Sequence, residues 1–215
     1  MHVEIRVMDL LVSRLCHDLI SPAGAIVNGL ELIEEMGPGE MSDEALELVG
    51  RSARQAAARL SLYRIAFGIA GERNDHPLSD GRKLLADYLQ DGKVVLDWRP
   101  DARLESQGAG PGVLRIMLAL AVVGAEALPR GGSLTIASQS DGDGLSITVE
   151  ARGVGARLDA GTVAALAAEE APAELDSRAV VGFIAGLLAR RLGTPVQCGL
   201  ETDRVQLRLT VPEVR

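Results

Sequence analysis

A histidine beside an acid, within a segment of helical periodicity, is the feature of this sequence most able to do chemistry. His17 and Asp18 open the run HDLISPAGAIVNGLELIEE. Apolar residues recur three or four positions apart here, which predicts an amphipathic helix. The stripe consists of Leu11, Leu15, Leu19, Pro22, Ile26, Leu30 and Ile33. Because each residue turns a helix by about 100°, His17 points away from this stripe and its imidazole is free to act as a nucleophile.

The outward face around this histidine has the features of a docking surface. Ser21 and Gly24 are small enough to let a partner approach the imidazole closely, and Ile20 offers an apolar contact. The residues expected to contact a docked partner are Arg14, Ile20, Ser21, Gly24 and Asn28. Asp18 lies nearer the apolar stripe, and two roles stay open for it. It either orients the ring and stabilises its positive charge, or it is an ordinary acid at the helix boundary.

Composition narrows the class of protein. The chain has 215 residues, of which 47% are hydrophobic and 24% charged, and its length is enough for one large or two small domains, each with a core. Its net charge of −8 argues against a nucleic-acid partner. We find neither a run of about 18 apolar residues nor a signal-peptide pattern, so we expect no membrane segment. Cys16 and Cys198 lack metal-ligand spacing, which favours a reduced, cytoplasmic setting without a bound metal.

Two long helices are expected at the N-terminus. The first runs from Glu4 or Asp9 to Met36, is kinked by the internal Pro22, and is weakened by Gly24 and Gly29. We infer that close packing or a docking surface compensates for the helix stability that these glycines cost. The second helix is expected to begin at the caps Ser42 or Asp43 and to carry an apolar seam. The seam comprises Leu46, Val49, Ala53, Ala56, Leu60, Tyr63 and Phe67, and the solvated side carries Arg51, Arg54, Arg59 and Arg64.

An antiparallel hairpin buries only one face of each helix, so we expect a homodimer that completes a four-helix bundle. The polar segment Gly71 to Pro77 then divides residues 1–72 from residues 73–215. The second part is expected to form a two-layer α/β sandwich, so the chain is α+β overall. Its expected helices span 79–90, 113–128, 162–168 and 177–192, and its strands span 93–99, 133–139, 144–151, 196–200 and 204–211.

The motif around the histidine resembles that of a known family. A histidine followed by an acid, and by proline five residues after the histidine, resembles the phospho-acceptor box of dimeric sensor histidine kinases. The longer run HDLISPAGAIVNGLELIEE resembles the ChpT family of bacterial histidine phosphotransferases. This resemblance implies a kinase-like dimerisation hairpin followed by a degenerate domain of the Bergerat ATPase type that binds no nucleotide.

The residues of the second part agree with a lost nucleotide site. In the kinase family the helix before the Pro-x-Gly-Gly turn carries asparagines for Mg²⁺ and phosphate, whereas residues 113–128 contain none, and Glu126 is their only acid. Ala151 stands where the family's aspartate would accept a hydrogen bond from adenine. Residues 180–186 have the pattern of a buried helix, where the kinase family has a glycine-rich phosphate lid. We expect no nucleotide and no cofactor of the chain's own.

By resemblance, the chain is a phosphorelay intermediate that carries a phosphoryl group on His17. The donor would be the receiver domain of a hybrid histidine kinase. The acceptors would be response regulators of the cell-cycle type, and each receiver would bring its own Mg²⁺. Autophosphorylation from ATP is not expected. Two alternatives stay open: a non-catalytic dimeric adaptor that binds receivers, and an ATP-dependent histidine kinase.

Overall fold

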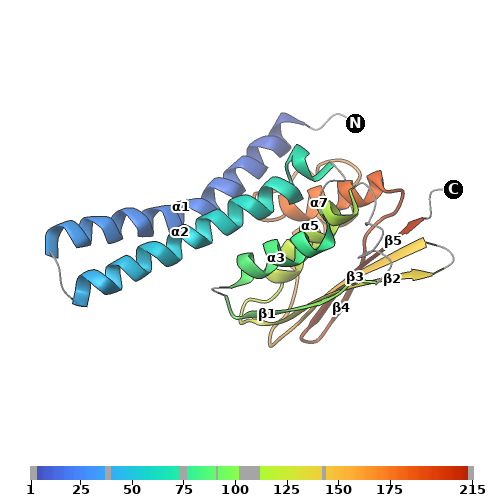
Figure 1. The fold of residues 1–215 in the computed structure, drawn as a ribbon. Coiled ribbons are helices and arrows are strands. Elements are labelled where there is room, and N and C mark those ends of the chain that lie inside the picture. The colour runs from blue at the N-terminus through green and yellow to red at the C-terminus, as the bar shows by residue number, and fades with distance from the viewer. Residues whose placement is uncertain are drawn as a thin grey trace.

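Two long antiparallel helices lie against the helical layer of an α/β sandwich (Figure 1). The computed structural model describes residues 4–36, 40–72, 77–90, 92–101, 112–141 and 144–212. Helix α1 spans Ile5–Met36 and α2 spans Glu40–Ala66. Their closed end extends well beyond the sandwich, so one end of the hairpin stands free and the other is packed against the rest of the chain (Figure 1). The predicted hairpin and the predicted sandwich are both confirmed.

The predicted packing of the hairpin was correct on α1 and partly correct on α2. Pro22 is buried and most of the α1 stripe is shielded, although Leu30 is exposed. On α2 the predicted seam residues Leu46 and Leu60 are exposed, whereas Ala45 and Ser52 are buried. Val49 and Tyr63 of the predicted seam do contact α1, so the seam was correct in part.

The ends of the hairpin differ slightly from expectation. Helix α2 begins at Glu40, so Ser42 and Asp43 lie inside it and the prediction that either caps it was wrong. Helix α1 runs through Pro22 to Met36 without interruption, and it bends part-way along its length (Figure 1). The breaker Gly37–Gly39 that was expected to end it lies outside the described residues.

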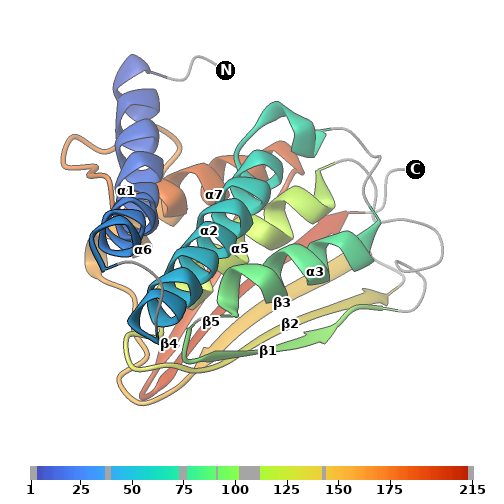
Figure 2. The ribbon, with the colours of Figure 1, turned by 60° about the vertical axis from the view of Figure 1, so that its left-hand side comes forward.

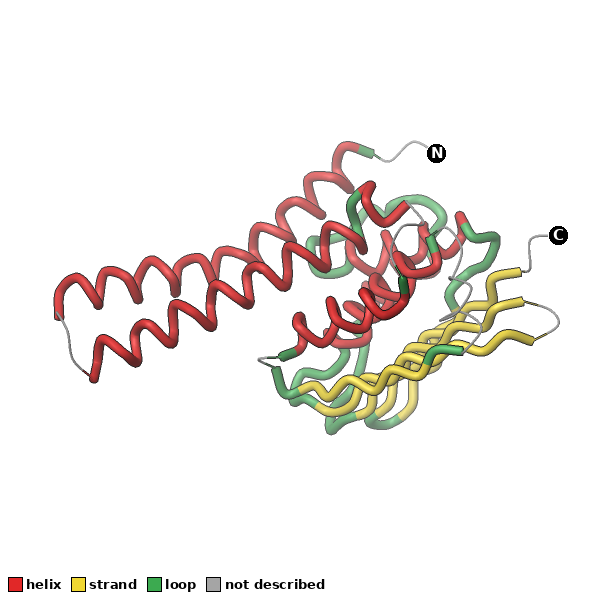
Figure 3. The backbone as a smooth tube through the Cα atoms, viewed as in Figure 1, coloured by secondary structure: helices red, strands yellow, loops and turns green. Residues whose placement is uncertain are grey.

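The sandwich is built on one five-stranded sheet with the strand order β1-β2-β3-β5-β4. Strands β1 and β2 are parallel and every other neighbouring pair is antiparallel. Helices α3, α5 and α7 cover one face of the sheet (Figures 2 and 3). The strands are β1 (Val94–Arg99), β2 (Gly132–Asp141), β3 (Gly144–Arg152), β4 (Gln197–Glu201) and β5 (Arg204–Pro212). The helices are η1 (Ile69–Glu72), α3 (Leu78–Leu89), α5 (Val113–Glu126), α6 (Ala160–Ala167) and α7 (Val180–Arg191).

One hydrophobic core joins the hairpin to the sandwich. Leu62 and Ile65 of α2 belong to the same buried cluster as the residues of α5. Arg115 of α5 donates to the carbonyl oxygens of Ala66 and Phe67 at the end of α2, at 3.3 and 3.1 Å. At the same end of the hairpin, Arg6 of α1 donates to the carbonyls of Pro172, Ala173 and Leu175. Packing and hydrogen bonds therefore cross the boundary expected near residue 72, whose residues 73–76, including His76, lie outside the described chain.

Helix α1 has the length and the apolar composition of a membrane-spanning segment. By these two criteria alone, Ile5–Glu35 could cross a membrane, with a mean hydropathy of 1.3 and few of its residues buried. Core helices of other proteins meet the same criteria. In this structure Arg14 and Asp18 lie within that span and form ion pairs, which a membrane interior would penalise. The expectation that no segment spans a membrane rests on these charges and on the packing of α1 against α2.

The two glycines of α1 serve different purposes. A Cβ atom added to Gly29 would lie 2.5 Å from Cγ2 of Val49, whereas one added to Gly24 would meet nothing within 4 Å. Gly29 therefore permits the close approach of α2, and Gly24 leaves open space beside the face that carries His17.

We predict that Gly29→Ala and Gly24→Ala will change stability in opposite directions. Alanine favours a helix by up to about 1 kcal/mol over glycine, so Gly24→Ala should stabilise the protein by roughly that amount. Gly29→Ala should destabilise it by about 1 kcal/mol or more, because the clash with Val49 outweighs the helix gain. Chemical denaturation measures both. Val49→Ala should relieve the loss in Gly29→Ala, and equal effects of the two alanines would contradict this packing.

Candidate functional site

The imidazole of His17 is exposed to solvent on helix α1, whose opposite side packs against α2. Its side chain is 86% exposed, whereas that of the neighbouring Asp18 is only 14% exposed. Nδ1 of His17 lies 3.5 Å from Oδ1 of Asp18, at the outer limit of a hydrogen bond. If Nδ1 carries the proton towards that carboxylate, Nε2 keeps its lone pair and faces away from the helix. The predicted outward position of His17 is therefore what the structure has.

The carboxylate of Asp18 is held from two sides. Its Oδ2 accepts a hydrogen bond of 2.6 Å from the hydroxyl of Tyr63 on α2 and one of 3.0 Å from Nε of Arg14. Burial raises the pKa of Asp18, but the Tyr63 hydroxyl and the Arg14 guanidinium outweigh it, so the pKa is lowered. Burial, chiefly, also raises the pKa of Tyr63 and keeps its hydroxyl a donor. Asp18 is thus a fixed anion whose other oxygen, Oδ1, is turned towards His17.

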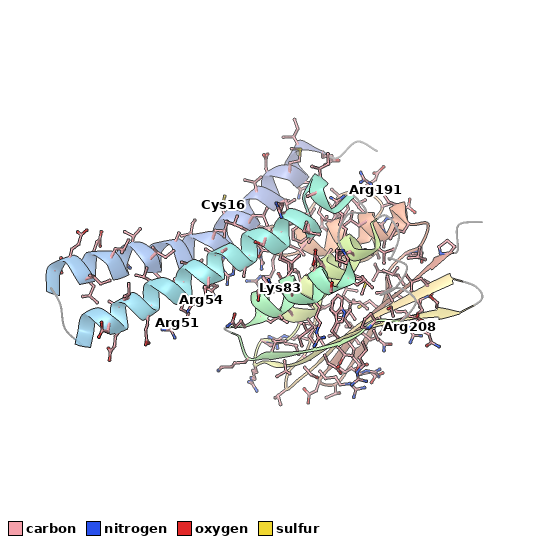
Figure 4. All side chains as sticks on the ribbon, in the orientation of Figure 1. Cys16, Arg51, Arg54, Lys83, Arg191 and Arg208 are labelled. Atoms are coloured by element: carbon pink, nitrogen blue, oxygen red, sulfur yellow. The ribbon has the colours of Figure 1, made fainter. Side chains whose placement is uncertain are left out.

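The backbone of Asp18 is also held, and the reason is Pro22. Proline has no N–H, so the carbonyl four residues earlier in a helix loses its usual donor. That carbonyl belongs to Asp18, and Nη1 of Arg59 on α2 donates to it. The prediction that Arg59 belongs to the solvated side of α2 was therefore wrong. Arg51 and Arg54 do lie on the side of α2 turned away from α1 (Figure 4), and Arg54 lines the same groove as Lys83 of α3.

Arg14 connects this site to the sandwich. Besides Asp18, its guanidinium binds Oε1 of Glu126 at the end of α5, 2.7 Å from Nη2. Burial lowers the pKa of Arg14, but Glu126 and Asp18 outweigh it and the pKa is raised, so Arg14 stays charged. Burial is the largest influence on Glu126 and raises its pKa to about 7, although Arg14 opposes it. Two acids therefore share one arginine.

Four of the five predicted docking residues lie on one exposed surface, and the fifth, Arg14, has its guanidinium turned inward. Ile20, Ser21 and Asn28 are exposed, and Gly24 is bordered by open space. The guanidinium of Arg14 is turned inward to Asp18 and Glu126, so it contributes to docking only through its effect on those acids. Whether any of these residues touches a partner stays a prediction.

Three residues of the site were missed or misread in the sequence: Arg59, Tyr63 and Glu126. Tyr63 was expected in the seam, and it is there, but its hydroxyl bond to Asp18 was not foreseen. Proline at position 22 was a usable signal that a donor was needed nearby. No local pattern indicates the contact between Arg14 and Glu126, which lie 112 residues apart.

The region that corresponds to a nucleotide site in kinases is filled or altered. Ala151 is buried, and Val180 to Gly186 form part of the buried helix α7, as predicted. A cavity of about 350 Å³ remains between α1 and the sandwich, and it receives charged side chains of the protein itself. Its lining consists of Arg14, Glu126, Pro129, Arg157, Asp159 and Arg178.

The structure thus has an exposed histidine beside a largely buried acid, on a helical hairpin that packs on an α/β sandwich. Residues 78–204, more than half of the chain, match the family described as "Histidine phosphotransferase C-terminal domain". The chain therefore belongs to the histidine phosphotransferase family.

Individual relatives agree with this assignment. The protein phosphotransferase ChpT of Brucella abortus (strain 2308) is 41% identical over 128 residues, which span 59% of this chain and 58% of that protein. A solved structure described as a bacterial phosphotransferase superposes with a TM-score of 0.80 at 30% identity, over 97% of this chain and 98% of that one. The histidine kinase AdeS of Acinetobacter baumannii reaches a TM-score of 0.47 at 12% identity, over 93% of this chain and 98% of that one.

We predict that Arg59 and Pro22 are energetically coupled. Arg59→Met should destabilise the protein by about 1–3 kcal/mol, because it leaves the half-buried carbonyl of Asp18 without a donor. In the Pro22→Ala background the backbone N–H returns, so Arg59→Met should cost clearly less. Denaturant unfolding of the four proteins of this double-mutant cycle measures the coupling. If the two substitutions changed the free energy of unfolding additively, Arg59 would not be the replacement for the missing N–H.

Proposed function

We propose that this protein is a phosphorelay shuttle that carries a phosphoryl group on His17 between aspartates of receiver domains. The observation that carries the proposal is the pairing of an 86% exposed imidazole with a fixed carboxylate, Asp18, at its Nδ1. A nucleophile that must reach a phosphoryl group on another protein needs this exposure. Membership of the histidine phosphotransferase family supports the same reaction.

The chemistry needs little more than this pair. Nε2 of His17 forms a bond to the phosphorus of a receiver's aspartyl phosphate, and the P–O bond breaks with its electron pair left on the aspartate. The proton stays on Nδ1, where the carboxylate of Asp18 stabilises the positive ring. In the second transfer an aspartate of another receiver attacks the phosphorus, the N–P bond breaks, and His17 returns to neutral imidazole. Atoms and charge balance with no further reactant.

This chemistry requires partners that carry a phosphorylatable aspartate, as receiver domains do. In-line phosphoryl transfer depends on positioning and on charge neutralisation by Mg²⁺, which we assign to the receiver. From the family resemblance we propose that the donor is the receiver of a hybrid histidine kinase and that the acceptors are response regulators with a cell-cycle role in the cytoplasm. The open face of α1 around Ile20, Ser21, Gly24 and Asn28 is the surface we assign to docking.

We further propose that the protein is a homodimer whose hairpins form a four-helix bundle. One side of the hairpin is apolar and exposed, with residues of α1 spaced three or four apart. This outer stripe consists of Ile5, Met8, Val12, Cys16, Ala23, Val27 and Leu30, and Ile20 lies at its border with the docking face. Leu46 and Leu60 are further exposed apolar residues, on α2. Such a surface is unfavourable in water, and a second copy would bury it.

We predict that His17→Gln abolishes transfer from a phosphorylated receiver while the protein stays folded. Glutamine keeps the polarity and exposure of the position but cannot form the N–P bond. Radiolabel passed from a receiver charged with acetyl phosphate measures the effect, with Glu35→Gln, an exposed position on the same helix, as the matched control.

The other outcomes of this experiment separate the alternatives. Transfer retained by His17→Gln would contradict the shuttle. A receiver that binds the wild type without labelling it would indicate an adaptor. Label acquired from ATP alone would indicate a kinase, which the buried Ala151 and the packed helix α7 disfavour.

We predict that Val12→Glu converts the dimer into a folded monomer. Val12 is exposed in the outer stripe, so burying a carboxylate between two hairpins should cost several kcal/mol and no monomer contact is lost. Light scattering after gel filtration should give a mass near 22.6 kDa for the variant and twice that for the wild type. Val95→Glu, an equally accessible valine on β1, should leave the dimer intact. A monomeric wild type would contradict the proposal.

A further inference from the structure

The carboxylate of Glu126 is a strongly perturbed acid near the site, and the proposed reaction does not use it. It lies at the end of α5, in the sandwich, and yet it contacts the helix that carries His17. In kinases the corresponding region serves the nucleotide, which this chain has no reason to bind. A mostly shielded acid kept at such a place needs another explanation.

The contacts form one continuous chain from the sandwich to the imidazole. Oε1 of Glu126 binds Nη2 of Arg14 at 2.7 Å, and Nε of the same guanidinium binds Oδ2 of Asp18 at 3.0 Å. Oδ1 of Asp18 faces Nδ1 of His17 at 3.5 Å. The guanidinium is planar and rigid, so holding its far nitrogen aims its Nε. Glu126 thereby determines the direction from which Arg14 donates its hydrogen bond to Asp18.

We propose that Glu126 is a positioning residue for phosphoryl transfer, acting through Arg14 to hold Asp18 in the orientation that supports His17. This inference rests on the proposed function. It gives the C-terminal sandwich a part in the reaction: a side chain of α5 determines how well a side chain of α1 stabilises the phosphorylated ring. Glu126 does not touch His17, so its effect passes through both intervening residues.

The charge of Glu126 changes within the physiological range, and this supplies a distinctive test. Burial raises its pKa to about 7, so it is neutral below that pH and charged above it. Only the charged form holds Arg14 as an ion pair. The groups that face Glu126 from the packed elements are Arg14 and Asp18 of α1, Tyr88 of α3, and Arg157, Asp159 and Arg178 of the sandwich loops. Glutamine imitates the neutral form with nearly the same shape.

The experiment measures single-turnover transfer from an acetyl phosphate-charged receiver to wild type and to Glu126→Gln between pH 6 and pH 9. We compare the two as the ratio of the wild-type rate to the variant rate. Because the same receiver is used in both reactions, the effects of the receiver's own titrating groups cancel in this ratio. We expect a ratio near one at pH 6 that rises to about tenfold at pH 8.5, the effect of one charge-assisted hydrogen bond. Glu169→Gln, an exposed acid of the sandwich, should give a ratio of one throughout.

A second comparison tests the route through Arg14. If Glu126 acts only by holding Arg14, then the double variant Arg14→Gln with Glu126→Gln should be no slower than Arg14→Gln alone. The thermal midpoint of Glu126→Gln at pH 8 should not fall, since burial disfavours the charge that the substitution removes. A slow variant is then not an unfolded one.

Three results would overturn the inference. A ratio of one at every pH would remove Glu126 from the reaction, and a constant ratio above one would leave it a merely structural role. If the double variant is slower than Arg14→Gln by the same factor that Glu126→Gln alone produces, the route through Arg14 is excluded. A wild type that never acquires phosphate on His17 would overturn the proposed function as well, whereas a labelled wild type with a flat ratio overturns this inference alone.

Discussion

The fixed position of Asp18 is the constraint on which the site depends. Four groups from three elements hold this single residue. Tyr63 and Arg14 bind its carboxylate, Arg59 binds its carbonyl, and Glu126 holds Arg14 in turn. The net effect is an anion with a lowered pKa beside an exposed imidazole. A freely rotating acid on a helix surface would spend little of its time facing Nδ1 of His17.

The proline that marks the motif has a physical consequence one turn away. Pro22 deprives the Asp18 carbonyl of its helical donor, and the replacement donor comes from the opposite helix of the hairpin. A local defect in α1 thus becomes a contact between α1 and α2 at the level of His17. The small residues facing α1, together with Gly29, bring the helices close enough for such contacts. The bend of α1 and the bracing of the site have the same origin.

The sandwich supplies both a buried apolar core and charged groups that reach α1. Helix α7 is packed with buried apolar side chains, and Ala151 of β3 is buried as well. What remains between α1 and the sandwich is a small cavity lined by charged groups of the protein itself. The shared core and the hydrogen bonds of Arg6 and Arg115 fasten the hairpin to this body. Side chains of the sandwich can therefore act on a residue of α1.

Periodicity was enough to predict the two long helices, the strands of the sandwich and the outward position of His17, because each depends on local spacing. It was wrong about part of the α2 seam, since Leu46 and Leu60 are exposed whereas Val49 and Tyr63 contact α1. It also left Arg59 in solvent and gave Glu126 no role. Both errors concern side chains that reach across to a distant segment, and no spacing within one helix indicates the partner of such a contact.

The most direct test of the account is the position of the phosphate on the ring. Nitrogen-15 and phosphorus-31 NMR of the protein, after it reacts with a phosphorylated receiver, can tell which nitrogen of His17 carries the phosphoryl group. With Asp18 held at Nδ1, the account predicts phosphate on Nε2 and a proton retained on Nδ1. Phosphate on Nδ1, or on any residue other than His17, would contradict it.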